Sequence, residues 1–193
     1  MAYQPRNAES LALFRGRCCT YRTPGRAGTT GQKIFSLFNA SASGRVVHIN
    51  QIAIDLYQTV AKTVAPPIIR IHRITTDTTN GNAVSKVAKD SALTSSASIT
   101  VKGDALTDGT SSSTALTHAS VGVAVLTACL TEEYAPRMLS AVGYEPFDRT
   151  ELLEGKDIIL RSNEGIVVFL DYTVATSNPT TDMYIVTCDW WEI

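Results

Sequence analysis

The sequence predicts an all-β protein, an antiparallel β-sandwich with an extended N-terminal arm. Thr, Val, Ile and Ser dominate short blocks that Gly, Pro and Asn separate, which is typical of strands joined by turns. Long stretches with the 3.6-residue period of a helix do not occur. The chain has 193 residues, of which 44% are hydrophobic and 18% are charged. This size and composition suit one folded domain with a single core.

The last block of the chain has the clearest alternation. Every second residue from Tyr184 to Trp190 falls on one side of the predicted strand, and Trp191 falls on the other. The two tryptophans therefore lie on opposite faces. We expect Trp190 in the core and Trp191 toward solvent or a neighbouring subunit.

Two more strands are predicted just before this one. The segment 164–175 (EGIVVFLDYTVA) is apolar on both faces at its start, and 156–162 (KDIILRS) leads into it through a turn at SNEG. Asn178 and Pro179 are turn residues that follow 164–175. The simplest arrangement is a terminal antiparallel hairpin between 164–175 and the last strand.

A long strand in the first half of the chain contains a change of phase. In 45–59 (RVVHINQIAIDLYQT) the apolar positions shift by one near Asn50 and Gln51, which indicates a β-bulge. We expect 65–76 (APPIIRIHRITT) to pair with this strand, with its prolines at the start because proline cannot donate to a ladder. Shorter candidates bring the total to roughly eight to ten strands: QKIFSLFN, AVSKVA, ASITVK and VAVLTACL.

Two regions depart from the strand pattern. Residues 103–120 are rich in Ser and Thr and nearly free of bulky side chains, which predicts a long exposed loop. Residues 132–154 could hold a helix, which Pro136 and Pro146 would limit to a turn or two.

The first 31 residues differ in charge from the rest. They contain five arginines and one acidic residue, whereas residues 32–193 carry 12 basic and 17 acidic residues. We therefore divide the chain into a basic extended arm, 1–31, and a β-sandwich domain, 32–193. Either the arm reaches across a subunit boundary, or part of it, LALF or RCCTYR, packs as an edge strand of its own domain. The arginines could make bidentate pairs with carboxylates of a partner: Arg6, Arg15, Arg17, Arg22 and Arg26.

The sequence has no motif for catalysis, a cofactor or a metal. It lacks the GxSxG elbow of a hydrolase and a glycine-rich phosphate loop. His48 and His72 lie inside predicted strands, where we expect their ring nitrogens to be satisfied locally, and we expect His118 to be solvated. A solvated turn explains the carboxylates that a glycosidase could use: Glu132, Glu133, Glu151 and Glu154.

The cysteines and the hydropathy exclude further classes. Cys18 and Cys19 are adjacent, which is not the spacing of structural zinc ligands, and we expect free buried thiols. The longest apolar run, 121–130, is about half of a bilayer span, and the N-terminus lacks a signal-peptide core. We expect a soluble protein with no membrane partner. The formal net charge of −1 gives no general attraction to nucleic acid.

One order of segments resembles a known group of proteins. SLFNASASGRVVHINQIAI precedes IIRIHRITT, a Gly-rich turn and AVSKVAKDSAL, and IILRSNEGIVVFLDY precedes a last strand ending in WWEI. Over about residues 35–193 this order is similar to that of tailed-bacteriophage capsid decoration or cement proteins of the jelly-roll type. The residues that match their turns are Lys86, Lys89, Asp90, Leu160, Glu164 and Gly165.

The resemblance implies a jelly-roll-like, non-enzymatic structural protein of the virion. Such a protein is assembled in the host cytoplasm and stabilises the outer capsid surface by binding the major capsid protein of the same phage. The resemblance also implies a homo-oligomer, with a trimer as the first choice, in which Trp191 or Phe147 packs across subunits. Nucleic acid is not an expected partner outside the shell. An alternative is a tail-spike, fibre or neck-associated module that binds host glycan or another virion protein.

Overall fold

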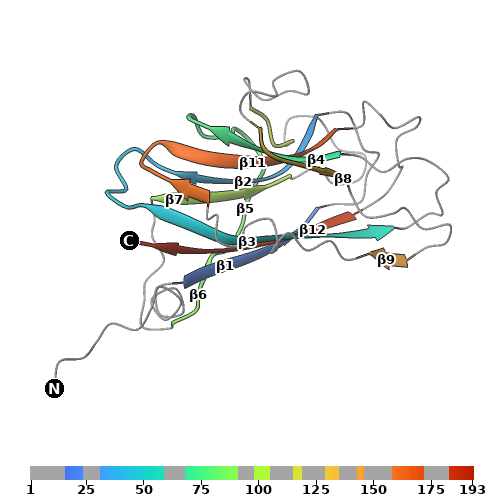
Figure 1. Cartoon of the computed structure of the whole chain (residues 1–193), viewed down its shortest axis with the longest axis horizontal. Coiled ribbons are helices and arrows are strands. Elements are labelled where there is room, and N and C mark those ends of the chain that lie inside the picture. The colour runs from blue at the N-terminus through green and yellow to red at the C-terminus, as the bar shows by residue number, and fades with distance from the viewer. Residues whose placement is uncertain are drawn as a thin grey trace.

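The protein is a two-layered sandwich of antiparallel sheets (Figure 1). The computed structural model describes residues 16–23, 31–58, 68–90, 98–104, 115–118, 129–134, 143–145, 158–171 and 183–193. These ranges contain strands, turns and connections, and no helix falls within them. The predicted all-β sandwich is confirmed.

Each layer is a six-stranded sheet. Sheet I has the order β10, β3, β12, β1, β6, and β9 also pairs with β3: β10 (Ile158–Leu160), β3 (Val47–Gln58), β12 (Met183–Glu192), β1 (Gly16–Arg22), β6 (Val87–Ala88) and β9 (Gly143–Glu145). Sheet II has the order β5, β7, β2, β11, β4, β8: β5 (Asn82–Ala83), β7 (Ile99–Gly103), β2 (Gln32–Asn39), β11 (Glu164–Asp171), β4 (Ile68–Ile74) and β8 (Cys129–Tyr134).

The main core lies between the two sheets. Alternate residues of the facing strands point into it, and the largest of the fully buried side chains there are Trp190 and Phe35. Trp190 comes from β12 in sheet I, and Phe35 comes from β2 in sheet II. Burying one large aliphatic or Phe side chain stabilises a fold by roughly 1.5–3 kcal/mol, so this layer of Val, Ile, Leu and aromatic residues holds the sheets together.

Two predicted strand pairings are wrong. β11 pairs with β2 and β4, whereas β12 pairs with β1 and β3, so the last two strands lie in different sheets and form no hairpin. β4 pairs with β11 and β8 instead of β3. Alternation shows which face of a strand is buried, but it does not choose the neighbour. Connections in sandwiches often pass from one sheet to the other.

The predicted β-bulge in β3 is confirmed. Asp189 of β12 lies opposite Gln51, and the next residue, Trp190, lies opposite Ile49. Asn50 is therefore the extra residue of the bulge. The bulge returns the apolar residues on both sides of it to the core, which explains the change of phase in the sequence.

The segment Gly16–Arg22, which we placed in the arm, is a strand of the sandwich. β1 pairs with β12 along its whole length and with β6 at Arg17 and Cys18. Of the two alternatives for the arm, the structure shows RCCTYR packed in its own domain, although it is not at the edge of the sheet where β6 covers it. Residues 1–15 and 24–30 lie outside the described residues.

The two regions without a strand pattern also differ from expectation where they are described. Asp104 and Leu116 of the 103–120 segment are buried, and a bridge joins Thr117 to Thr79. These parts of the segment are anchored and are not an exposed loop. In 132–154, the described residues belong to β8 and β9 and are not helical. The prolines of 65–67, residues 121–128 and the rest of 132–154 lie outside the description.

Candidate docking face on sheet I

The outer surface of sheet I follows from the alternation of its strands. In β12, every second residue from Tyr184 to Glu192 is buried, and the residues between them are partly exposed. Their cross-strand partners in β3 and β1 share the outward direction. We call this surface the sheet I face, formed by Ile159, His48, Gln51, Ala53, Asp55, Ile185, Thr187, Asp189, Trp191, Cys18, Thr20, Arg22 and Val87.

The sheet I face contains two exposed aliphatic side chains at its sides. Val87 of β6 is 58% exposed, and Ile159 of β10 is 41% exposed. Most of the residues between them are uncharged. A sheet surface that is poor in charge and exposes aliphatic side chains is the kind of surface that protein partners cover.

An aromatic stack stands on this face. The rings of Trp191 and His48 are parallel, with centroids 4.1 Å apart and an interplanar angle of 22°. His48 lies opposite Trp191 on one side and Ile159 on the other, so the three residues form one row across the strands. Trp191 points outward and Trp190 is buried, as we expected from the alternation of the last strand. The stack fixes the indole in one orientation, which makes it a preorganised anchor.

A surface ion pair borders the stack. Lys89 Nζ donates to Asp189 Oδ2 at 2.6 Å, and the two side chains are 35% and 18% exposed. The Lys89 backbone N–H donates to the Gly16 carbonyl, which holds the lysine beside β1. The acid and the base neutralise each other, so this part of the face can be covered by a partner without leaving a single buried charge.

Beneath the sheet I face, Glu192 lies at the centre of a buried polar cluster. It accepts a hydrogen bond from Trp190 Nε1 at 3.3 Å and one from Arg45 Nη1 at 3.4 Å, and it lies 3.9 Å from Arg17 Nε. Arg17 itself is buried, and its Nη1 donates to the Gly16 carbonyl. Arg17 is therefore not a partner-binding arginine, which corrects our prediction. Its position in β1 turns it toward the interior, where a carboxylate must compensate its charge.

The predicted arginines are not brought together by the structure. Arg22 is exposed at the end of β1 and belongs to the sheet I face. Arg6, Arg15 and Arg26 lie outside the described residues, so their role remains a prediction. The site therefore contains two of the predicted residues, Arg22 and Trp191.

The prediction that the ring nitrogens of His72 are satisfied locally is wrong. His72 is fully buried against Phe169, edge to face at 4.7 Å, and neither of its ring nitrogens has a hydrogen-bond partner. Burial, and then the charge of Arg70, lower the pKa of His72 below its usual value. His118 is partly exposed, and its Nε2 lies 3.0 Å from both the hydroxyl and the carbonyl oxygen of Thr76.

The thiols separate into exposed and buried types. Cys18, Cys19 and Cys188 are free, as predicted, and the side chain of Cys129 lies outside the description. Burial raises the pKa of Cys19 to about 12 and raises that of Cys188 as well. Cys18 is instead half-buried on the sheet I face, with its thiol 3.8 Å from the Val87 carbonyl. Thiolate chemistry is thus suppressed in the core.

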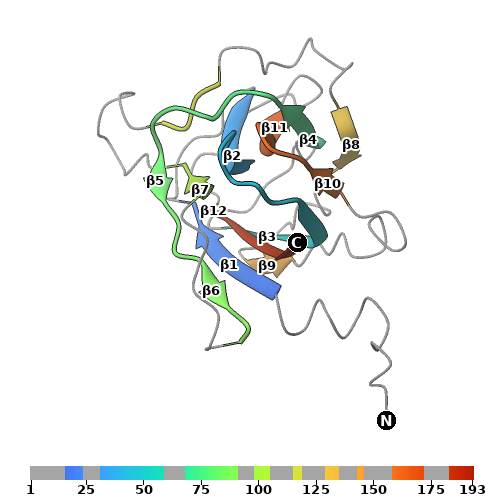
Figure 2. The ribbon, with the colours of Figure 1, turned by 90° about the vertical axis from the view of Figure 1, so that its left-hand side faces the viewer.

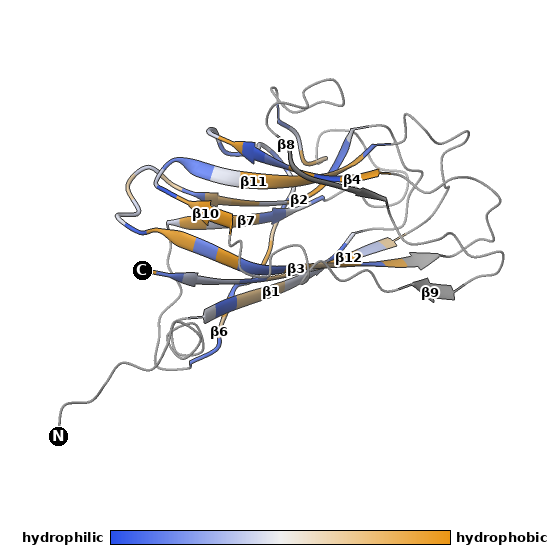
Figure 3. Ribbon diagram, viewed as in Figure 1, coloured by the Kyte–Doolittle hydropathy of each residue, from blue (hydrophilic) through white to orange (hydrophobic). Residues whose placement is uncertain are grey.

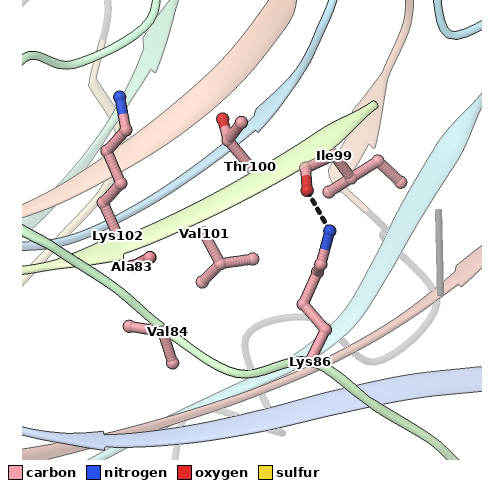
Figure 4. A pocket seen from close by; sticks show the side chains of 7 residues that line it. All are labelled: Ala83, Val84, Lys86, Ile99, Thr100, Val101 and Lys102. Atoms are coloured by element: carbon pink, nitrogen blue, oxygen red, sulfur yellow. Dashed lines mark hydrogen bonds between the residues drawn. The ribbon is translucent and has the colours of Figure 1, made fainter. Parts of the chain in front are cut away.

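The described side chains offer little for a metal or a small ligand. No group of three or more His, Cys, Asp or Glu residues with the geometry for a metal ion occurs within the described ranges. A hollow of about 210 Å³ lies between β7 and the segment that leads to β6, where Lys86 Nζ donates to the Ile99 carbonyl (Figure 4). Its other lining residues are ordinary strand side chains. No helix of the described part is long and apolar enough to cross a membrane.

Comparison with known proteins does not assign a function. No protein-family model and no curated protein matches the chain. The functional argument therefore depends on the geometry of the sheet I face.

Sequence analysis missed several residues of this face. Asp189 could have been found, because it alternates in phase with Trp191. Lys89, Val87 and Ile159 could not, because β6 and β10 are very short strands whose neighbours are distant in sequence. Their exposure became visible only with the strand order of sheet I.

Proposed function

We propose that the protein is a non-enzymatic structural protein of a bacteriophage virion, which binds and stabilises the outer capsid surface through the sheet I face. The resemblance of residues 35–193 to capsid decoration proteins suggests the class of assembly. The observation that carries the proposal is the open sheet I face with its fixed Trp191–His48 stack, in contrast to β11 of sheet II, whose outward residues are buried.

Two properties of the structure, its stable body and the sheet I face, suit this role. A decoration protein needs a stable body, and the layer of buried aliphatic residues between the sheets supplies one. It also needs a broad contact surface of low charge with a rigid aromatic anchor, since Trp is enriched among the residues that dominate binding energy. The partner in this proposal is the major capsid protein. Copies of the protein are proposed to close around a symmetry axis, with a trimer as the first choice.

The test is binding to shells purified from a phage that lacks this gene. Wild-type protein is expected to saturate the shells at regular lattice positions. Trp191→Ala is expected to weaken binding by roughly 30-fold, the effect of an interface residue worth about 2 kcal/mol. Thr75→Ala, at an exposed position that follows β4 in sheet II, is the matched control and should bind as wild type. Absence of wild-type binding would overturn the proposal, and equal binding of the two variants would exclude the sheet I face.

A second candidate is a tail-spike, fibre or neck-associated module that binds host glycan or another virion protein. The half-buried indole of Trp191 beside the Asp189–Lys89 pair favours it, because sugar sites combine an aromatic ring with polar groups. Host-glycan binding that Trp191→Ala abolishes, together with no binding to shells, would select this candidate.

A further inference from the structure

One stretch of β1 has no strand beside it within the described residues. β6 pairs with Arg17 and Cys18 only. The chain before β6 comes from sheet II, where β5 pairs with β7, and it crosses between the layers along one side of the sandwich (Figure 2). Among the described residues, the chain pairs with this side of β1 only at Val87 and Ala88, so no described strand pairs with Cys19–Arg22 there.

The backbone of alternate residues points to this edge. On the β12 side, the Thr23 N–H donates to the Tyr184 carbonyl at 2.8 Å, and on the β6 side, the Gly16 carbonyl accepts from Lys89 N–H at 3.0 Å. Because the direction alternates along an antiparallel strand, the odd-numbered residues of β1 bond to β12. The outward N–H and C=O groups belong to Thr20 and Arg22, and no described backbone group pairs with them.

The edge is exposed and held in a fixed shape. Thr20 and Arg22 are the exposed residues of β1, and no charged partner of Arg22 is found among the described side chains. The residues that alternate with them point inward: Cys19 belongs to the core, and the Tyr21 hydroxyl donates to the Asp104 carbonyl of sheet II. An edge that is already extended pays little conformational entropy when a strand is added.

We propose that Cys19–Arg22 of β1 is a strand-addition site for an extended, acidic segment of the partner. This proposal rests on the proposed function and specifies how the partner is held. The partner segment pairs with the outward backbone groups of Thr20 and Arg22, and one of its carboxylates pairs with the Arg22 guanidinium. Backbone hydrogen bonds supply affinity in such complexes, and the arginine selects for acidic segments.

A second copy of the chain fits this edge less well. Antiparallel pairing of two such edges around a two-fold axis would bring β6 of each copy toward the other chain just beyond Thr20. It would also place both Arg22 side chains in one short ladder, where like charges repel. A heterologous acidic strand meets neither obstacle.

The experiment compares three variants for binding to the same gene-deleted shells. Thr20→Pro removes the outward N–H while the β12 ladder is kept, and it is expected to weaken binding about tenfold. Thr20→Val loses the same hydroxyl contact to Thr187 but keeps the N–H, so it should bind as wild type. Arg22→Glu, which alters no ladder bond, should weaken binding at least about tenfold through charge repulsion.

Amide hydrogen exchange of the wild-type protein gives a second readout that needs no variant. On binding to shells, exchange at Thr20 and Arg22 should slow by about tenfold or more, while the Cys19 and Tyr21 amides change little because they already bond to β12. If wild type binds shells but all variants bind equally and these amides stay unprotected, strand addition is wrong and the proposed function stands. Dimerisation of the isolated chain that Thr20→Pro abolishes would overturn the proposed partner in favour of a second copy.

Discussion

Strands β11 and β12 follow one another in the element order and lie inside the two sheets, yet they differ in how their faces are used. In β11, Val167, Phe169 and Asp171 point away from the main core and are nevertheless fully buried. In β12, the corresponding outward residues, such as Ile185 and Trp191, are partly exposed. Figure 3 shows β11 as hydrophobic over most of its length and β12 as mixed. The outer side of sheet II around β11 therefore belongs to the interior of the molecule, whereas the outer side of sheet I is available to a partner.

Two ion pairs, one on the outer side of each sheet, allow this difference in burial to be tested. Arg70 and Asp171, on the outer side of sheet II, are buried with Nη2 and Oδ2 3.0 Å apart. We expect Asp171→Asn to lower the free energy of unfolding by about 3–5 kcal/mol, because an uncompensated guanidinium stays buried. Asp189→Asn, which breaks the Lys89 pair on sheet I, should cost at most about 1 kcal/mol. Urea unfolding measures both, and equal losses would contradict the difference between the two outer sides.

Outward aromatic residues should show the same difference. Phe169→Ala is expected to cost about 3–5 kcal/mol of unfolding free energy, since it leaves a cavity beside His72. Trp191→Ala should cost about 1 kcal/mol, chiefly the stack with His48, because its site is already partly solvated. A Trp191 variant as unstable as the Phe169 variant would show that sheet I is also covered.

The free energy of unfolding should fall in acid because the buried His72 resists protonation in the folded protein. Its pKa in the folded protein is lowered by burial, so the unfolded chain takes up the proton first, below its usual pKa of about 6.5. The neutral His72 ring makes its full contribution to the free energy of unfolding above that pH. This contribution is lost as the pH falls toward the folded-state pKa, by at most about 1.4 kcal/mol per pH unit. In urea unfolding at several pH values, His72→Phe should remove this slope. An unchanged slope would assign acid sensitivity to other groups.

Thiol labelling should give the smallest effect, because it reports only on the surroundings of each cysteine. On the native protein, iodoacetamide should modify Cys18 on the sheet I face, while Cys19 and Cys188 react only on unfolding, because burial raises the pKa of both. Mass spectrometry with fragmentation separates the adjacent Cys18 and Cys19. Labelling of Cys188 at the rate of Cys18 would contradict the closed core beneath β12.

Much of the fold could be predicted from local pattern. The alternation of β12 correctly separated Trp190 from Trp191, and the change of phase in β3 located the bulge at Asn50. The pairing of strands could not be predicted, since β11 and β12 look like a hairpin in sequence but lie in different sheets. The prediction for Arg17 was also wrong. The charge of the first 31 residues suggested a free arm, and it gave no sign that Glu192 compensates the charge of Arg17 in the interior.

The sequence by itself determined the long strands β3, β11 and β12 and which side of β3 and β12 faces the core, because side-chain direction alternates with a fixed period of two along a strand. Only the tertiary structure decided which strands are neighbours, that the outward residues of β11 are buried, and that Ile159, His48 and Trp191 form one row. These are long-range relations among segments far apart in the chain, and their free energy depends on the packing of whole layers, which no local pattern encodes.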